Sequence, residues 1–423
     1  MNEVPKYEWG DGVFTLLSWF EKEKVKNARV LVAGCGALGN EVVKNLALFG
    51  VGHIVVADFD RIELSNLTRS VLFREADAMV HEFKADVVAR RAMEINPQIK
   101  VTPIVGRLES EVPFGVYRRM DVIIGCLDSR LARYLLNRMA MRAGKQWVDA
   151  GIENLAGNVR IFTPGLNCYE CSLSREEFNN IMLRTGCADV VRTQEQAGRV
   201  ATTPISASII GAMQVQEALK IIHLNAQSSE ADTSQRRDTQ ADATSDMQSP
   251  AKSPFKTLQG RMLHYDGMTN SVGIYKYTSW KKNCTAHERW DNIKEATTLS
   301  AKMTLSDTLK ELKTMLGVKK VQINMRNNKF IDKIVTENPE KEYEARVPES
   351  RIDDFIRHND ELRKRSYRST LFKTTFEILD DHFPYPTLTL EQIGIPPLDV
   401  IEVQTQGKLL HIELSADAPL FGF

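Results

Sequence analysis

Three glycines in the spacing G-x-G-x-x-G stand between an apolar stretch and a segment with helical periodicity: Gly34, Gly36 and Gly39. A turn without side chains lets the backbone come close to a phosphate, and the following helix offers free N–H groups and the positive end of its dipole. Asp58 ends the next apolar stretch, nineteen residues beyond Gly39, where a carboxylate can bond a ribose hydroxyl. The turn predicts a nucleotide site and by itself favours a dinucleotide, as in dehydrogenases. The alternative is a tight turn without a ligand.

Basic and amide side chains gather in the chain that follows Asp58. Asn66, Arg69 and Lys84 all come before the third apolar stretch. A dehydrogenase does not need these side chains, whereas a triphosphate carries about four negative charges and requires cations to hold it. Asp128 ends a later apolar stretch, faces the same crevice and could bind Mg²⁺ through oxygen. The set favours ATP over a dinucleotide, although a surface ion pair is the alternative for any single member.

Four soft ligands occur as two close pairs. Cys168 and Cys171 form a C-x-x-C, and Cys284 and His287 form a C-x-x-H. Two such pairs make the tetrahedral ligand set of a structural zinc site, which would fix the chain on either side of residues 225–256. Incidental spacing and a redox pair are the alternatives.

Cys187 lies in a polar segment that contains three nearby arginines. Positive charge lowers the pKa of a thiol and favours the thiolate, so Cys187 is a candidate nucleophile. A spare surface cysteine is the alternative. Cys35 and Cys126 lie in the glycine turn and at the end of an apolar stretch, where we expect small packing residues.

Strands and helices must alternate to position these side chains. Strands are expected at 30–34, 53–58, 100–105 and 121–128, and helices at 38–49, 83–96 and 130–143. This alternation predicts an α/β fold with a doubly wound, Rossmann-like and mainly parallel sheet. An antiparallel return from residue 147, an apolar helix over 205–223 and a hairpin at 263–277 should follow.

The length of 423 residues predicts more than one domain. Residues 1–290 are expected to form the nucleotide-binding domain, with an irregular polar segment at 172–203 that carries the candidate nucleophile. Residues 225–256 have almost no large apolar side chains, and we expect a disordered loop there. Residues 291–423 should form a C-terminal α+β domain.

Composition excludes several classes of function. Hydrophobic residues make up 43% and charged residues 26%, as in a globular protein with a sizeable core. The formal net charge of 0 gives no reason to expect nucleic acid or a membrane surface as a partner. Polar residues interrupt the longest apolar run, which excludes a membrane span, and the N-terminus lacks the features of a secretory signal. We therefore expect a cytoplasmic protein.

The spaced motifs resemble, in their order, the activating enzymes for ubiquitin and ubiquitin-like proteins, including the bacterial adenylyltransferases of sulfur-carrier proteins. The motifs are D-x-D at 58–60, S-N-L-x-R at 65–69, K-A-[ED]-V-[AV] at 84–88 and L-D-[SN]-x-x-A-R at 127–133. The resemblance covers about residues 28 to 290 and is specific, because several separate motifs agree.

This resemblance implies an ATP site and assigns its residues. They are Gly34, Gly36, Gly39, Asp58, Asp60, Asn66, Arg69, Lys84 and Asp128. Asp58 would hold the ribose, and Asp128 would position Mg²⁺ for catalysis. Asn66, Arg69 and Lys84 would hold the phosphates. The family commonly has two C-x-x-C pairs at its zinc site, so His287 would be a substituted ligand.

The resemblance also implies the reaction. The C-terminal carboxylate of a ubiquitin-like protein attacks the α-phosphate of ATP, and pyrophosphate leaves. Arg69, Lys84 and Asp128 would serve this step by positioning and neutralising charge. The thiolate of Cys187 would then attack the acyl-adenylate, and the partner would pass to a conjugating enzyme. ATP, Mg²⁺ and Zn²⁺ are the expected cofactors.

One departure from the family concerns its arginine-rich start, which reaches across a homodimer to the ATP of the other subunit. The first arginine here is Arg29, which already enters the first strand. The contact is either missing or made by another basic residue such as Lys6. A homodimer remains the expected assembly.

The last part of the chain resembles the closing strands of a β-grasp fold. Residues 387–404 suggest a strand, a short turn with G-x-P-P and another strand, after a charged, helix-rich part at 351–368. Eukaryotic-type activating enzymes end in a ubiquitin-fold domain that recruits the conjugating enzyme. A plain stabilising appendage is the alternative.

Three alternatives to an activating enzyme for a ubiquitin-like protein remain. A sulfur-carrier adenylyltransferase would dispense with Cys187, because a sulfur donor attacks the adenylate instead. The added C-terminal domain favours the activating enzyme over it. A non-catalytic scaffold subunit would not need Arg69, Lys84 and Asp128, and an oxidoreductase would not need the cations.

Overall fold

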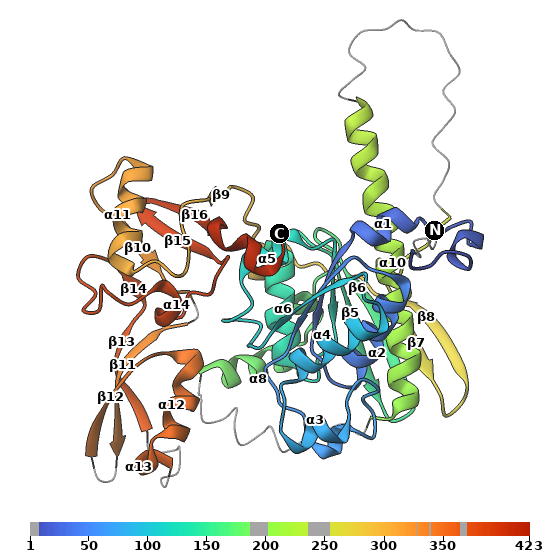
Figure 1. Ribbon diagram of the computed structural model, residues 1–423, viewed down its shortest axis with the longest axis horizontal. Coiled ribbons are helices and arrows are strands. Elements are labelled where there is room, and N and C mark those ends of the chain that lie inside the picture. Colours follow the sequence, from blue (N-terminus) through green and yellow to red (C-terminus); the bar gives the residue numbers. More distant parts are fainter. Residues whose placement is uncertain (1–7, 187–201, 236–253, 327, 338–339, 364–369) are drawn as a thin grey trace, which may run out of the picture.

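The computed structural model describes residues 8–186, 202–235, 254–326, 328–337, 340–363 and 370–423. Within these residues the largest feature is an eight-stranded sheet (Figure 1). Its strands are β1 (Arg29–Ala33), β2 (His53–Ala57), β3 (Lys100–Ile104), β4 (Val122–Gly125), β5 (Trp147–Glu153), β6 (Ala156–Phe162), β7 (Arg261–Asp266) and β8 (Ser271–Lys276). Strands run in the order β3-β2-β1-β4-β5-β6-β7-β8, in which β3 to β5 are parallel and β6 to β8 antiparallel. The expected Rossmann-like sheet is confirmed as a mixed sheet.

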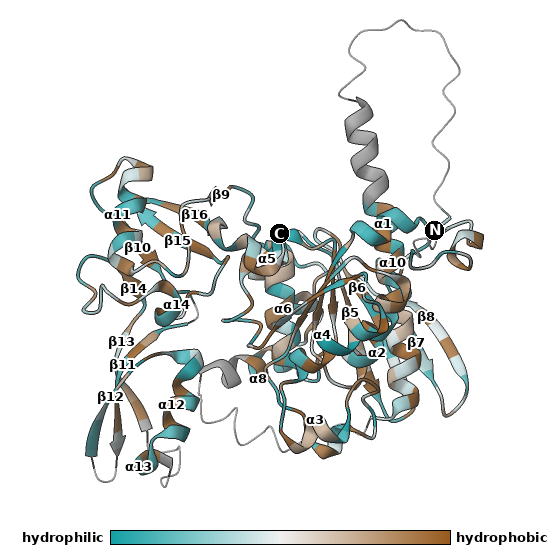
Figure 2. Cartoon of the chain, viewed as in Figure 1, coloured by the Kyte–Doolittle hydropathy of each residue, from teal (hydrophilic) through white to brown (hydrophobic). Residues whose placement is uncertain are grey.

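Successive side chains of β1 point to opposite faces of the sheet and belong to two separate hydrophobic cores. Val30 and Val32 join one core with α2, α4 and α10, whereas Leu31 and Ala33 join the other with α5 and α6. The covering helices are α2 (Ala37–Phe49), α4 (Lys84–Ile95), α5 (Phe114–Arg119), α6 (Arg130–Arg142) and α10 (Pro204–Gln235). Apolar strands therefore lie between helical layers, as Figure 2 shows.

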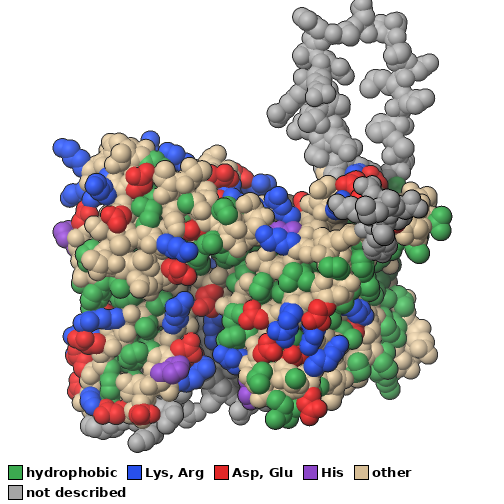
Figure 3. Space-filling view, viewed as in Figure 1, with side chains coloured by type: hydrophobic (Ala, Val, Ile, Leu, Met, Phe, Trp, Pro, Cys, Tyr) green, Lys and Arg blue, Asp and Glu red, His purple; other side chains and the backbone are tan. Residues whose placement is uncertain are grey.

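Shorter elements connect these layers. They are η1 (Phe14–Leu16), α1 (Lys22–Asn27), η2 (Leu64–Asn66), α3 (Glu75–Met79), α7 (Tyr169–Ser172), α8 (Arg175–Gly186) and η3 (Thr285–His287). No helix among the described residues combines the length and hydropathy needed to cross a bilayer. Figure 3 shows acidic and basic side chains interspersed over one face, in keeping with the net charge of 0.

Two segments expected to be irregular contain helix. Residues 175–186, inside the expected irregular segment 172–203, form α8. The helix α10 continues to Gln235, although a disordered loop was expected from residue 225. Once a helix is nucleated, each further residue adds a hydrogen bond, so polar residues without glycine or proline can extend it. Cys187 lies outside the described residues, as does the remainder of both segments up to 201 and 253.

The chain after residue 291 forms two smaller sheets. One has the order β14-β10-β15-β16-β9, and the other the order β12-β11-β13. The strands are β9 (Ile293–Ala296), β10 (Gln322–Asn324), β11 (Phe330–Glu337), β12 (Glu340–Pro348), β13 (Thr370–Phe376), β14 (Ile378–Leu379), β15 (Val400–Thr405) and β16 (Lys408–Leu414). The helical elements are α11 (Leu305–Leu316), η4 (Glu349–Arg351), α12 (Ile352–His358), α13 (Asp360–Arg363), α14 (Leu390–Ile393) and η6 (Ser415–Phe421). Leucines of α11 pack on the first sheet, and isoleucines of α12 pack on the second.

Residues 390–393 are helical, so the strand expected there is wrong. The alternation T-L-T-L resembles a strand, but Thr389 and Gln392 form a capping box that starts α14. Gly394 ends this helix in the left-handed region, with a φ of +108°.

The C-terminal segment, residues 291–423, caps the N-terminus of α5. The carboxylate of Asp399 accepts a hydrogen bond from the backbone N–H of Phe114 at 2.8 Å. The carbonyl oxygen of Leu398 accepts one from the N–H of Gly115 at 3.2 Å. A Cβ on Gly115 would lie 2.3 Å from that oxygen, so only glycine permits this approach.

The other end of α5 binds Glu413, which is fully buried. Its carboxylate accepts hydrogen bonds from Arg118 and from both Nη atoms of Arg119, the shorter at 2.7 Å. Beside this cluster Trp290 stacks on His411 with ring centroids 4.1 Å apart. Residues 291–423 are thus attached to the large sheet by a buried, charged contact.

Candidate nucleotide and metal sites

The three glycines of the turn differ in what their absent side chains would meet. Gly34 has a φ of +97°, and a Cβ there would lie 2.4 Å from the carbonyl oxygen of Cys126. A Cβ on Gly39 would lie 2.0 Å from the carbonyl oxygen of Gly34. By contrast, nothing lies within 4 Å of a Cβ on Gly36. Packing of the chain on itself requires the first and third glycines, whereas the second faces open space that a phosphate could enter.

The helix behind this turn begins without a side-chain cap. Gly36 is its N-cap residue, so the first N–H groups of α2 are left for a ligand. Asn40, fully buried, donates from Nδ2 to the carbonyl oxygens of Cys35 at 2.8 Å and Gly36 at 3.0 Å. Its Oδ1 accepts from the N–H of Leu72 at 2.9 Å. Asn40 therefore fixes the turn, a role that sequence reasoning missed although an amide among apolar helix positions was a visible signal.

Asp58 is tied to the glycine turn directly. Its Oδ2 accepts from the N–H of Cys35 at 2.7 Å, and its Oδ1 accepts from the N–H of Asp60 at 2.8 Å. Burial raises the pKa of Asp58, and the ammonium of Lys84 offsets only part of that rise. Each carboxylate oxygen keeps a lone pair that a ribose hydroxyl could use.

Lys84 brings the acidic residues of the site together. It begins α4, and its Nζ donates to Oδ2 of Asp60 at 2.7 Å. Burial alone would lower the pKa of Lys84, but the charges of Asp58, Asp60 and Asp128 outweigh it, so the pKa is raised. The ammonium of Lys84 therefore lies against Asp60 at the carboxyl edge of the sheet, and its raised pKa favours the charged form.

Asn66 and Arg69 lie in the segment between β2 and α4. Oδ1 of Asn66 accepts from the N–H of Glu63 at 3.0 Å, and Nη1 of Arg69 donates to the carbonyl oxygen of Ser65 at 2.8 Å. These bonds order the segment itself. No hydrogen bond within the described part of the chain joins either side chain to Asp58.

Asp128 follows β4 and precedes α6, whose N-cap is Ser129. The side chain is exposed. Across the described ranges it has no hydrogen-bond or ion-pair partner, so its carboxylate is free to bind a cation through oxygen.

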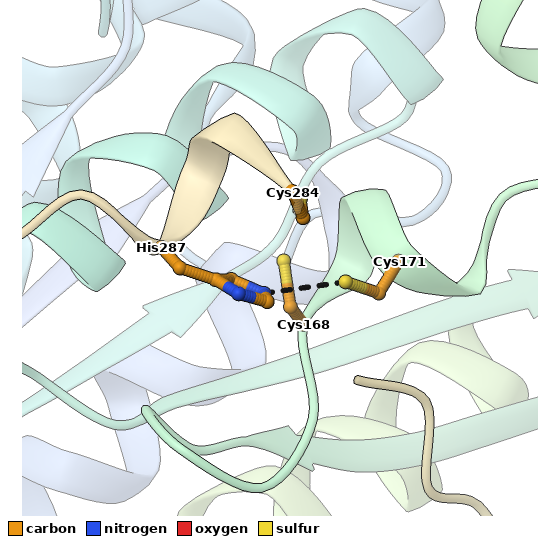
Figure 4. A group of neighbouring side chains, drawn as sticks. All are labelled: Cys168, Cys171, Cys284 and His287. Atoms are coloured by element: carbon orange, nitrogen blue, oxygen red, sulfur yellow. Dashed lines mark hydrogen bonds between the residues drawn. The ribbon is translucent and has the colours of Figure 1, made fainter. Parts of the chain in front are cut away.

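The four soft ligands meet at one point. Figure 4 shows Cys168, Cys171, Cys284 and His287 converging from two chain segments. All four ligand atoms lie within 4.8 Å of one another, and Sγ of Cys171 is 3.2 Å from Nε2 of His287. Ligand atoms of a tetrahedral zinc site lie about 3.5–4 Å apart. The four residues therefore fit zinc.

Neighbouring groups orient these ligands. Asn137 donates from Nδ2 to Sγ of Cys168 at 3.1 Å, and the ring of Trp280 stacks on His287 with centroids 3.3 Å apart. Burial raises the pKa of Cys168 and of Cys284 to about 11. As free thiols both would stay protonated, and binding of zinc would displace these protons because the ligand is the thiolate.

The other two described cysteines are packing residues. Cys35 and Cys126 are buried in the core, and burial raises the pKa of both thiols well above the ordinary value. A protonated, buried thiol is not a nucleophile.

The ThiF family matches residues 14–286, about two thirds of the chain. The chain belongs to the ThiF family. This confirms the resemblance to the activating enzymes for ubiquitin-like proteins and to the sulfur-carrier adenylyltransferases. The matched residues include the glycine turn, the carboxylates of Asp58, Asp60 and Asp128, and three of the four zinc-type ligands. Residues 291–423 lie outside the match.

This ThiF chain is similar to adenylyltransferases of sulfur carriers and to subunits of activating enzymes. The sulfur carrier protein adenylyltransferase of Thermus thermophilus is 33% identical over 207 residues, which are 48% of this chain and 71% of that protein. The NEDD8-activating enzyme E1 catalytic subunit of Schizosaccharomyces pombe is 37% identical over 161 residues, 36% of either chain. The alignment therefore spans about a third of that relative's length. A crystal structure of Escherichia coli MccB with ATP is 22% identical, with a TM-score of 0.44, over 63% of this chain and 68% of that one.

Proposed function

We propose that this chain is an ATP-dependent adenylyltransferase that activates the C-terminus of a ubiquitin-like or sulfur-carrier protein. The observation that carries the proposal is the open space at Gly36, which lies at the N-terminus of α2 next to Asp58 in a ThiF chain. A turn that merely closed on itself would not need glycine at this position.

Different residues of the site bind the ribose and the phosphates of ATP. Asp58 binds the ribose hydroxyls, and the N–H groups at the start of α2 bind phosphate oxygens. Lys84 neutralises phosphate charge from a half-buried position, where charges act more strongly than in water. Arg69 and Asn66, in the segment between β2 and α4, would bind phosphate oxygens together with Lys84.

Asp128 holds Mg²⁺ in this proposal, and when bound the ion neutralises charge on the phosphates. The carboxylate suits the task because it is exposed and has no partner within the described ranges. Asp128 follows β4 and Asp58 follows the parallel strand β2, so both lie at the carboxyl edge of the sheet, and the charge of Asp128 contributes to the raised pKa of Lys84.

The chemistry is a displacement at phosphorus. A carboxylate oxygen of the partner's C-terminus forms a bond to the α-phosphorus of ATP, and the bond from that phosphorus to the bridging oxygen of pyrophosphate breaks. Lys84 and Arg69 stabilise the charge that moves onto pyrophosphate. Orientation of the two reactants supplies much of the remaining rate enhancement.

The exposed edge of the large sheet is a place where the partner can dock. The outer strand β8 leaves Val272 58% and Ile274 55% exposed. Main-chain groups on the outer side of an edge strand can pair with a strand of another protein, and exposed apolar side chains would add contact area. Replacing both residues by lysine should weaken partner binding without changing ATP affinity.

A second step, thioester formation on Cys187, extends the proposal to an activating enzyme. The helix α8 ends one residue before Cys187, and it packs on the start of α6. Arg130 pairs with Glu177 at 2.8 Å, and the rings of Tyr134 and Phe178 are 6.2 Å apart. These contacts anchor the first turn of α8 to α6, and Cys187 follows the other end of α8, outside the described residues.

Residues 291–423 would then receive the conjugating enzyme. They have a hydrophobic core of their own, formed by residues between Ala296 and Leu414, which supports a domain boundary near residue 290. A homodimer remains part of this proposal, and its mass in solution tests it.

The alternative is a sulfur-carrier adenylyltransferase without a cysteine step, a function named for the Thermus relative. A non-reducing gel with ATP and the partner separates the two. Cys187→Ala should still adenylate the partner but lose the thiol-sensitive adduct. If no adduct forms even with the unmodified chain, yet adenylation proceeds, the alternative holds. If Lys84→Ala adenylates as well as the unmodified chain, both functions are refuted.

A further inference from the structure

Arg133 closes the motif that begins at Leu127, and the proposed function leaves it without a role. Its guanidinium joins acceptors from two segments. Nη2 donates to the carbonyl oxygen of Leu127 at 2.7 Å and to that of Ala150 at 2.9 Å. Nε donates to Oδ1 of Asp149 at 2.9 Å. The residue before Asp128 is therefore tied to β5 by one side chain.

Asp149 holds this guanidinium in a single orientation. The carboxylate is fully buried on β5, directly opposite Arg160 on β6. Its Oδ2 accepts from Nε of Arg160 at 2.9 Å, and Nη1 of Arg160 donates to the hydroxyl of Tyr277 at 2.8 Å. Charge-assisted bonds of this forked kind are directional, so Arg133 has little freedom to turn.

Asp128 depends on its backbone for its position. Because the exposed carboxylate has no partner within the described part of the chain, only the segment around it can aim it. The N–H of Cys126 donates to the carbonyl oxygen of Ala33 at 2.7 Å, which fixes one side. Oγ of Ser129 accepts from the N–H of Ala132 at 3.1 Å, which fixes the other. Between them the carbonyl of Leu127 is held by Arg133.

We propose that Arg133 is the positioning residue for Asp128. It holds the carbonyl of Leu127 against β5 so that the next carboxylate stays at the carboxyl edge of the sheet, where Asp58 also lies. This inference rests on the proposed function, in which Asp128 acts on the phosphates. The fork of an arginine reaches all three acceptors at once, whereas a lysine is a point charge that can satisfy only part of the set.

The test compares two substitutions that disturb the same buried carboxylate. Arg133→Lys keeps a cation beside Asp149, which avoids an unpaired buried charge, but loses the fork on Leu127. Arg160→Lys disturbs the other oxygen of Asp149 and leaves the bond to Leu127 intact. Arg130→Lys, on the exposed face of the same helix, is the surface control.

Partner-dependent exchange of pyrophosphate into ATP gives the first readout. Arg133→Lys should lower kcat by about 10- to 100-fold, since a misplacement near 1 Å can cost about 100-fold. The KM for ATP should change less than about threefold, because Asp58 and the glycine turn are untouched. Arg160→Lys and Arg130→Lys should keep kcat. Equal losses of kcat in the first two variants, or a loss confined to KM, would overturn the positioning role.

Amide hydrogen exchange without nucleotide gives the second readout and does not depend on any activity. In Arg133→Lys the amides of residues 126–132 should exchange at least about tenfold faster, while those of 284–287 keep their rates. Unchanged exchange in 126–132 contradicts the inference. Absence of pyrophosphate exchange in the unmodified chain with every partner would instead refute the proposed function, and the amide rates would still decide the role of Arg133.

Discussion

Replacing Glu413 by glutamine should loosen the attachment of residues 291–423 to α5. The carboxylate is fully buried and accepts hydrogen bonds from Arg118 and Arg119, whose side chains are 24% and 17% exposed. Removing one partner of a buried pair typically costs about 3–5 kcal/mol, because the remaining charge is left uncompensated. Glutamine keeps the shape and an acceptor oxygen, so we expect a loss of about 2–3 kcal/mol.

A matched control shares the same arginine. Glu295 lies 3.3 Å from Arg118 but is 56% exposed, and an exposed pair contributes about 0–1 kcal/mol. Urea unfolding followed by tryptophan fluorescence measures both variants, since Trp290 stacks on His411 at this junction. A loss of unfolding free energy in Glu413→Gln no larger than in Glu295→Gln would contradict this role of Glu413.

The pH dependence of stability provides a second test of the role of Glu413. Burial alone would raise the pKa of Glu413, but the bonds from Arg119 and Ser415 and the charges of both arginines lower it below the ordinary value of 4.5. A carboxyl whose folded pKa is depressed stabilises the protein above its unfolded pKa and loses that contribution as the pH falls through the folded pKa. The unmodified chain should therefore lose stability below about pH 4.5 more steeply than Glu413→Gln does.

Further predictions concern the metal site, the glycine turn and one histidine. Freshly purified protein should contain about one zinc ion per chain, and the double variant Cys168→Ser, Cys284→Ser should lose both the metal and thermal stability; metal analysis without zinc contradicts this. Gly36→Ala should fold normally, because a Cβ at this position meets only open space, but it should bind ATP at least about tenfold more weakly in calorimetry, because the Cβ occupies the space left for a phosphate. Gly34→Ala, by contrast, should destabilise the fold. Burial, with Lys100 and Arg29 nearby, lowers the pKa of His53 from 6.5 to about 4, so stability should fall as the pH drops through that window. Allowing for solvent screening the loss is about 1–2 kcal/mol, and a melting curve of His53→Gln should lack it.

The elements around the glycine turn could be predicted because their signals are local. The strand before Gly34 is an unbroken apolar run, and the helix after Gly36 ends at a glycine in the left-handed region, Gly50. The pairing of four zinc-type ligands also followed from short spacings, C-x-x-C and C-x-x-H. Sequence patterns shorter than about twenty residues were therefore enough to predict the elements of the large sheet and the candidate zinc ligands.

Other features were missed because their partners lie far apart in the chain or their patterns conflict. The buried carboxylate of Asp149 is explained only by Arg133 and Arg160, which reach it from a helix and a neighbouring strand. The residues before α14 alternate like a strand, and a capping box at Thr389 overrides that alternation. Glu413 pairs with Arg118 and Arg119, which lie almost three hundred residues earlier in the chain, so no short sequence pattern could indicate this contact.

Partner-dependent exchange of pyrophosphate into ATP, measured for the unmodified chain and for Asp128→Ala, tests whether Asp128 acts on ATP. The carboxylate is exposed and has no packing to lose, so the variant should melt at the same temperature. We expect the unmodified chain to exchange pyrophosphate into ATP when a ubiquitin-like or sulfur-carrier partner is present, and Asp128→Ala not to do so. Undiminished exchange in Asp128→Ala would contradict the assignment of this crevice to ATP.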